Sequence, residues 1–208
     1  MRYFTNLEVA NSYIDITNDG SQVVPSTVAG NQVQTGNICA NVYTFDPAEE
    51  LISCCSCLVT PNALVSLSSG NDLISNTLTP ATPSSIVVKL LATHPIVNST
   101  TGANSCNPAA PLNLISTSNP RGFAPSLHAW GTTTHALALG SGTSYSITET
   151  EFSQALLSQA PTNLPTGSSA LDYEFNRLTQ FCGFIQSNGS GFGVCRSCRT
   201  GALGAARD

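Results

Sequence analysis

Eight cysteines constrain the fold of this chain more than any other feature of its sequence. Their number is even, and three of them lie within four residues. An even, clustered set in a chain with a single lysine predicts up to four disulfides, formed in an oxidising compartment. The sequence does not give the pairing, because such a set allows roughly a hundred connectivities. The cysteines are Cys39, Cys54, Cys55, Cys57, Cys106, Cys182, Cys195 and Cys198.

The cluster at 54–57 predicts how the bridges are distributed. Neighbouring residues of a strand point to opposite faces, so Cys54 should find its partner on one side of a sheet and Cys55 on the other. Cys57 should share the face of Cys55. If all the cysteines pair and none pairs within the cluster, one bridge must join two of the five that remain.

Two other uses of these cysteines, a zinc site and a redox motif, fit the sequence less well. Cys54-x-x-Cys57 and Cys195-x-x-Cys198 together supply four thiolates, the number that a tetrahedral zinc site requires. That model leaves Cys55 and the other cysteines without a role, so no metal is expected. A thioredoxin-like use of Cys195 and Cys198 requires a helix N-terminus in a βαβ setting, which nothing in the sequence indicates.

Composition excludes some partners and favours export. Charged residues make up only 9% of the chain and the net charge is -5, so a basic surface for nucleic acid is not expected. The most apolar stretch, 86–92, contains Lys89 and is too short for a membrane span. The first residues include Asn6 and Glu8 instead of an apolar signal core, so we expect a leader that was removed or that starts upstream.

The strand pattern predicts a mainly β fold. Short runs of β-branched and apolar residues, bounded by Pro, Asn or Gly, recur with the spacing of a β-sandwich. The Asn18-Asp19-Gly20 turn predicts a hairpin that joins 13–17 to 22–24. We expect a single β-sandwich-like domain cross-linked by disulfides. The remaining predicted strands are 38–45, 51–59, 63–69, 84–92, 127–139 and 145–148.

One strong helix signal lies near the C-terminus. Leu171, Phe175, Leu178, Cys182 and Ile185 share one face of a helix over about 169–187. Ser168 or Ser169 can cap its start, and Asn188-Gly189 can end it. We expect it to pack on a sheet with Cys182 pointing inward. A capping box at Thr148 and Glu151 also predicts a short helix through Leu157, and residues 95–125 are expected to form a long exposed excursion.

Residues 1–37 contain no cysteine and are expected to form an N-terminal strand or hairpin segment, with 38–208 as the disulfide-stapled domain. Tyr13, Ile14 and Ile16 give this segment a strand with apolar side chains. Such a strand is suited to completing the open sheet edge of a neighbouring copy. The alternative is an ordinary first hairpin that packs on its own domain.

No catalytic group and no cofactor site is predicted. Residues 189–193 match neither a dinucleotide fingerprint nor a nucleophile elbow, and a tight or flexible loop is favoured. The three histidines, His94, His128 and His135, lack metal-binding spacing, and Glu149 and Glu151 are explained equally well as solvated side chains. Asn98 and Asn188 begin N-glycosylation sequons, which arise easily by chance in a chain so rich in Asn, Ser and Thr.

Three segments resemble a family of uncharacterised, cysteine-rich exported proteins of environmental bacteria, particularly acidobacteria. They are the strand at 39–47, the cysteine cluster with the residues after it at 54–62, and the segment 181–193. The similarity covers about 13–203. It implies export, and it implies no activity and no catalytic residue.

These features favour an extracellular or cell-surface structural subunit of a filament, pilus-like fibre or surface layer, with further copies of itself as partner. The alternative is a secreted binding module, an adhesin or glycan-binding protein that uses residues 95–125. An enzyme with an unrecognised site is a third hypothesis, and nothing in the sequence names its residues.

Overall fold

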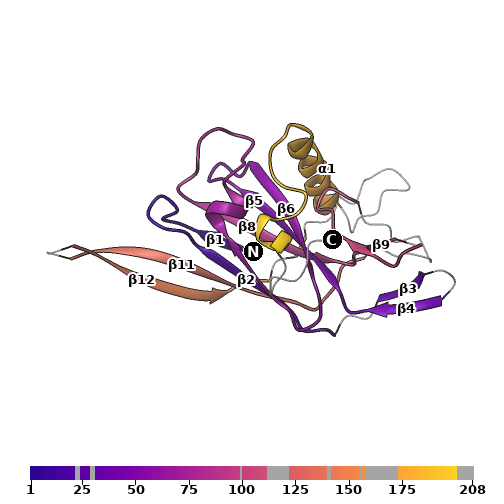
Figure 1. Ribbon diagram of the computed structural model, residues 1–208. Coiled ribbons are helices and arrows are strands. Elements are labelled where there is room, and N and C mark those ends of the chain that lie inside the picture. Colours follow the sequence, from indigo (N-terminus) through magenta and orange to yellow (C-terminus); the bar gives the residue numbers. More distant parts are fainter. Residues whose placement is uncertain are drawn as a thin grey trace.

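The computed structural model describes residues 1–21, 24–28, 31–98, 100–111, 122–139, 142–154, 156–157 and 173–200 (Figure 1). Two four-stranded antiparallel sheets form most of this part of the chain. Sheet A has the order β1 (Arg2–Phe4), β8 (Ile86–Thr93), β5 (Ile38–Phe45) and β6 (Leu51–Val59). Sheet B has the order β12 (Gly142–Glu151), β11 (Leu127–Leu139), β2 (Tyr13–Asn18) and β7 (Leu64–Ser68).

The core lies between these sheets because alternate residues of their strands are apolar. In β2, Ile14 and Ile16 are fully buried, whereas Tyr13 faces outward and is 44% exposed. The inner face of sheet A contributes aliphatic side chains and two cysteines to the same cluster, among them Val42, Cys55, Cys57, Ile86 and Val88. The structure is therefore a mainly β sandwich, which confirms the predicted fold class.

Helix α1 (Tyr173–Ser187) covers the outer face of sheet A. Tyr43 of β5 and Cys54 of β6 form a second buried cluster there with Leu178 and Cys182 of the helix. The prediction that the helix packs on a sheet with Cys182 inward is confirmed. The helix ends at Ser187, as predicted, and the φ of 79° at Gly189 permits the closing turn. Leu171 and the proposed caps lie outside the described residues.

The remaining elements are short. β3 (Val24–Val28) pairs with β4 (Asn31–Thr35), and β9 (Ile96–Val97) pairs with β10 (Asn104–Ser105). A π-helical turn, η1 (Ser69–Leu73), follows β7, and a 3-10 helix, η3 (Arg196–Thr200), ends the described chain.

Three predictions of local structure were wrong. β2 does not form a hairpin with the following strand, because its two edges pair with β11 and β7 and β3 pairs with β4. No helix begins at Thr148, because residues 142–151 continue as β12 along ten residues of β11. The described part of 95–125 is anchored by more than Cys106, since Tyr43 Oη donates to the Pro108 carbonyl at 2.8 Å and Val97 is buried.

The N-terminal residues are integral to the sandwich. β1 joins sheet A beside β8, and β2 lies in the middle of sheet B. Tyr13, Ile14 and Ile16 therefore belong to a strand whose two edges are both occupied by its own chain. This corrects the expectation that the strand is free to join a neighbour, and the alternative that placed it in its own core describes the structure.

Candidate functional site: the disulfide-bonded centre and the open sheet edge

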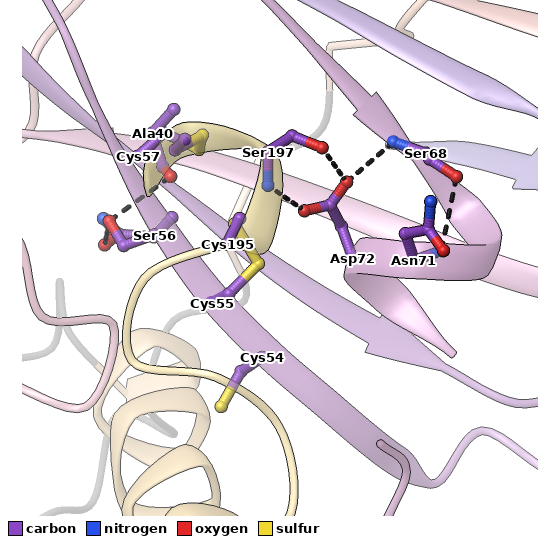
Figure 2. The surroundings of a disulfide bond; sticks show 12 residues. Ala40, Cys54, Cys55, Ser56, Cys57, Ser68, Asn71, Asp72, Cys195 and Ser197 are labelled. Carbon is purple, nitrogen blue, oxygen red and sulfur yellow. Dashed lines mark hydrogen bonds between the residues drawn. A yellow bond between two sulfur atoms is a disulfide. The ribbon is translucent and has the colours of Figure 1, made fainter. Parts of the chain in front are cut away.

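Three disulfides join strand β6 to distant segments of the chain (Figure 2). Cys54 is bonded to Cys182 of α1, on the outer face of sheet A. Cys55 is bonded to Cys195, and Cys57 to Cys198, in the sandwich core or at its margin. The opposite faces predicted for Cys54 and Cys55 are therefore confirmed. The fourth bridge joins two cysteines from outside the cluster, Cys39 and Cys106.

The same geometry argues against the zinc model with two C-x-x-C pairs. The Sγ atoms of Cys57, Cys195 and Cys198 lie within 4.8 Å of one another. Cys54, the fourth ligand of that model, points to the other face of the sheet, toward α1 (Figure 2). The four thiolates thus do not converge on one point.

A buried carboxylate that the sequence did not single out positions two of these cysteines. Asp72 of η1 is fully buried, and its Oδ1 accepts a hydrogen bond from Ser197 N at 2.8 Å. Its Oδ2 accepts from Ser197 Oγ at 2.6 Å and from Ser68 N at 2.8 Å (Figure 2). Three donors compensate the loss of water around the charge. Because Ser197 lies between Cys195 and Cys198, these bonds hold both cysteines opposite β6.

The glycine-rich loop before Cys195 covers the outer edge of β6. Phe192 N donates to the Cys54 carbonyl at 2.9 Å, and Ser56 N donates to the Gly193 carbonyl at 3.2 Å. Gly191 has a φ of 67°, and a Cβ placed on it would lie 3.0 Å from the Cys54 oxygen. The loop is therefore a tight turn, one of the two forms predicted from the sequence, and it covers the edge of sheet A.

The strands β11 and β12 extend beyond the sandwich as a two-stranded arm (Figure 1). β2 pairs only with the 127–132 half of β11, whereas β12 pairs with β11 from Trp130 to Leu139. The base of the arm is held by Arg2, whose Nη1 donates to the Thr150 carbonyl at 2.8 Å. Farther out, Tyr145 is 59% exposed and Ile147 is 67% exposed. The arm is thus anchored at one end, and the side chains of Tyr145 and Ile147 are exposed farther along it.

β12 differs from the strands at the other three edges of the two large sheets. β6 is covered by the glycine-rich loop, β7 packs against η1 and η3, and β1 is three residues long. β12 has ten residues and ends the strand order of sheet B. Within the described part of the chain, it is the one long edge of these sheets that carries no covering segment.

The other candidate residues do not come together. His128 Nε2 lies 3.1 Å from Asp19 Oδ2, and His135 Nε2 lies 2.8 Å from Thr148 Oγ1. Hydrogen bonds from Ser21, followed by the one from His128, lower the pKa of Asp19. His94 belongs to neither contact, and Glu149 and Glu151 are exposed on β12. No shared site for these side chains exists in the described residues.

The two sequon asparagines are exposed and engaged in local turns. Asn98 Oδ1 accepts hydrogen bonds from Thr100 N at 2.9 Å and from Thr101 N at 3.0 Å. Asn188 Nδ2 donates to the Phe184 carbonyl at 2.8 Å, at the end of α1. Glycosylation of either remains a prediction.

No protein family, curated protein or solved structure matches the chain. None of the helices in the described ranges is long and apolar enough to cross a membrane.

Proposed function

We propose that this chain is an extracellular structural subunit that associates with further copies through the outer edge of β12. The four disulfides support an oxidising compartment, because such bonds persist outside the cytosol. The observation that carries the proposal is the ten-residue edge of β12, which no segment of the described chain covers.

An edge of this kind favours association. It presents a row of unpaired N–H and C=O groups, and proteins ordinarily blunt such rows with proline, lysine, a bulge or a covering segment. β12 has no proline and no lysine, and its register with β11 is unbroken. The charged residues Glu149 and Glu151 lie at the anchored end, so the outer half of the strand is uncharged.

The sequence of β12 is suited to pairing with itself. In an antiparallel pair centred on Ser146, Tyr145 of each copy lies opposite Ile147 of the other, on the same face. Cross-strand pairs of an aromatic and a β-branched side chain stabilise sheets by about 0.2 to 1 kcal/mol each. Glu149 then lies opposite Thr143 and about 20 Å from the equivalent carboxylate, at 3.4 Å per residue. A pair centred on Glu149 would place two carboxylates face to face.

This contact replaces donation of the N-terminal strand as the proposed route of assembly. A pair of β12 strands has two-fold symmetry and closes on itself, so it joins two sheets B into one sheet of eight strands. A fibre or surface layer requires a second contact on each subunit. The pair is the first step of such an assembly, and the disulfides keep its subunits folded outside the cell.

A charge on the edge tests the proposal. Ile147→Lys should shift the native mass from the associated form to the monomer, because it removes both cross-strand pairs with Tyr145 and adds two like charges to the contact. Leu64→Lys is the matched control: Leu64 is 57% exposed on β7, at the opposite edge of sheet B, and its replacement should leave association unchanged. Light scattering after gel filtration measures both. A monomeric wild-type chain, or equal loss in the two variants, would overturn the proposal.

A further inference from the structure

A cavity of about 480 Å³ lies between α1 and the turn that joins β5 to β6. This volume falls within the range of about 300 to 1,000 Å³ that small-molecule sites occupy. The cavity is on the outer side of sheet A, whereas the edge of β12 belongs to sheet B. We propose that it binds an apolar amine, a small molecule with an aromatic or aliphatic body and a positively charged nitrogen.

The walls of the cavity are mostly apolar. Leu178 and Ile185 of α1 are buried beneath it. Around its mouth, Phe181 is 51% exposed, Phe184 is 56% exposed and Leu78 is 39% exposed. Three large apolar side chains that converge on one hollow offer the contact area that an apolar ligand body requires, and binding removes their surface from water.

Carboxylates dominate the charge of the lining. Glu49 and Glu50 come from the β5–β6 turn, whereas Glu174, from the first turn of α1, is paired with Lys89. Arg177 is the one basic residue among the described residues of the lining. Its guanidinium carbon lies 5.9 Å from the centre of the Phe181 ring, so a cation already rests on an aromatic face at this site. The two carboxylates of the turn, Glu49 and Glu50, lie beside exposed rings and complement a positively charged ligand.

The turn holds its carboxylates in a fixed place. Asp46 Oδ1 accepts hydrogen bonds from Ala48 N and Glu50 N, both at 2.9 Å. Glu49 has a φ of 65°, in the left-handed region that a glutamate seldom adopts. Residues held in this conformation cluster at binding sites. The hydrogen-bonded turn therefore places both residues in the lining of one hollow, where their carboxylates would pair with the cation of the proposed ligand.

Three probes that share a phenylbutyl group and differ in the terminal polar group test the inference. They are 4-phenylbutylamine, 4-phenylbutanol and 4-phenylbutanoate. Each is titrated into the protein at pH 7 and low salt, and binding is followed by NMR chemical shifts. The amine should bind at least tenfold more tightly than the carboxylate, with the alcohol between them. Glu49→Gln should weaken amine binding about three- to fivefold, because exposed ion pairs contribute up to about 1 kcal/mol, and should leave the alcohol unchanged.

Two further variants make the result decisive. Phe184→Ser should weaken all three probes at least tenfold, whereas Arg177→Gln should leave amine binding intact or strengthen it. Both side chains are exposed, so the fold is retained, and Leu64→Ser serves as a variant outside the cavity. Equal affinity for the three probes would overturn the inference. The inference would also be overturned if the carboxylate bound most tightly of the three probes and lost that binding in Arg177→Gln. A failure of every probe to saturate the protein at millimolar concentration would overturn it as well.

Discussion

Asp72 shows how one side chain organises the disulfide-bonded centre. Its carboxylate is fully buried, yet the residues bonded to it come from β7 and from the segment between Cys195 and Cys198. The bonds to Ser197 span 125 residues of sequence. A buried charge is tolerated only where donors replace water, and here two backbone amides and a hydroxyl do so. The carboxylate thus holds the segment of the C-terminal cysteines beside β6.

Asp72→Ala should lower the free energy of unfolding by about 3 kcal/mol, because it leaves buried donors of Ser68 and Ser197 without an acceptor. Denaturant titration with the disulfides intact measures this. Glu149→Ala, at an exposed carboxylate of β12, should change it by less than about 0.5 kcal/mol. Similar losses in both variants would show that the Asp72 contacts do not stabilise the fold.

No sequence pattern marked Asp72, because its partners are distant in the chain and a lone aspartate in a turn has no characteristic spacing. The two-residue period of strands, in contrast, was sufficient to predict the face of the sheet on which each cysteine of β6 lies. It separated Cys54 from Cys55 and placed Cys57 with the latter, as the bridges confirm. The bonding partners of these cysteines could not be predicted without the fold, since each bridge from β6 spans more than a hundred residues.

At the scale of elements, the glycine-rich loop of 189–193 acts as a cover for an edge strand. Gly191→Ala should destabilise the fold by about 1 to 3 kcal/mol, because its φ is positive and its Cβ would press on the Cys54 carbonyl. Gly193→Ala is the matched control, since nothing lies within 4 Å of a Cβ built there. Thermal unfolding distinguishes the two, and equal melting temperatures would contradict the described fit of the loop on β6.

An element that forms from its own periodicity could be predicted from the sequence. Phe175, Leu178, Cys182 and Ile185 recur at helical spacing, and all four are buried on one face of α1. Non-local strand pairing could not be predicted in this way. The turn signal after β2 suggested a local hairpin, but β2 pairs with β11, more than a hundred residues later. The alternation in 145–148 predicted a strand without showing that it lies at an edge.

For the whole molecule, the disulfides connect the layers of the fold. One bridge joins α1 to sheet A, and two join β6 to the C-terminal segment. Each contributes about 2 to 4 kcal/mol, chiefly by restricting the unfolded chain. A subunit outside the cell cannot be refolded by cytosolic chaperones, so such cross-links suit the proposed role.

The oxidised state is directly measurable. Complete reduction should add eight mass units, two for each of the four bridges, and the native chain should contain no zinc. Intact mass spectrometry before and after reduction, with metal analysis of the native sample, measures both. Free thiols with stoichiometric zinc would contradict the oxidising compartment on which the proposed function depends.

The central claim is that the edge of β12 is the contact between copies, and hydrogen exchange measures it directly. Exchange of the amides in 142–151 should slow as the concentration rises from micromolar to millimolar, because the outward N–H groups gain partners. Amides of β7 at 64–68, at the opposite edge of the same sheet, should exchange at the same rate throughout. An increase in native mass with concentration, without slower exchange of the amides in 142–151, would contradict this claim.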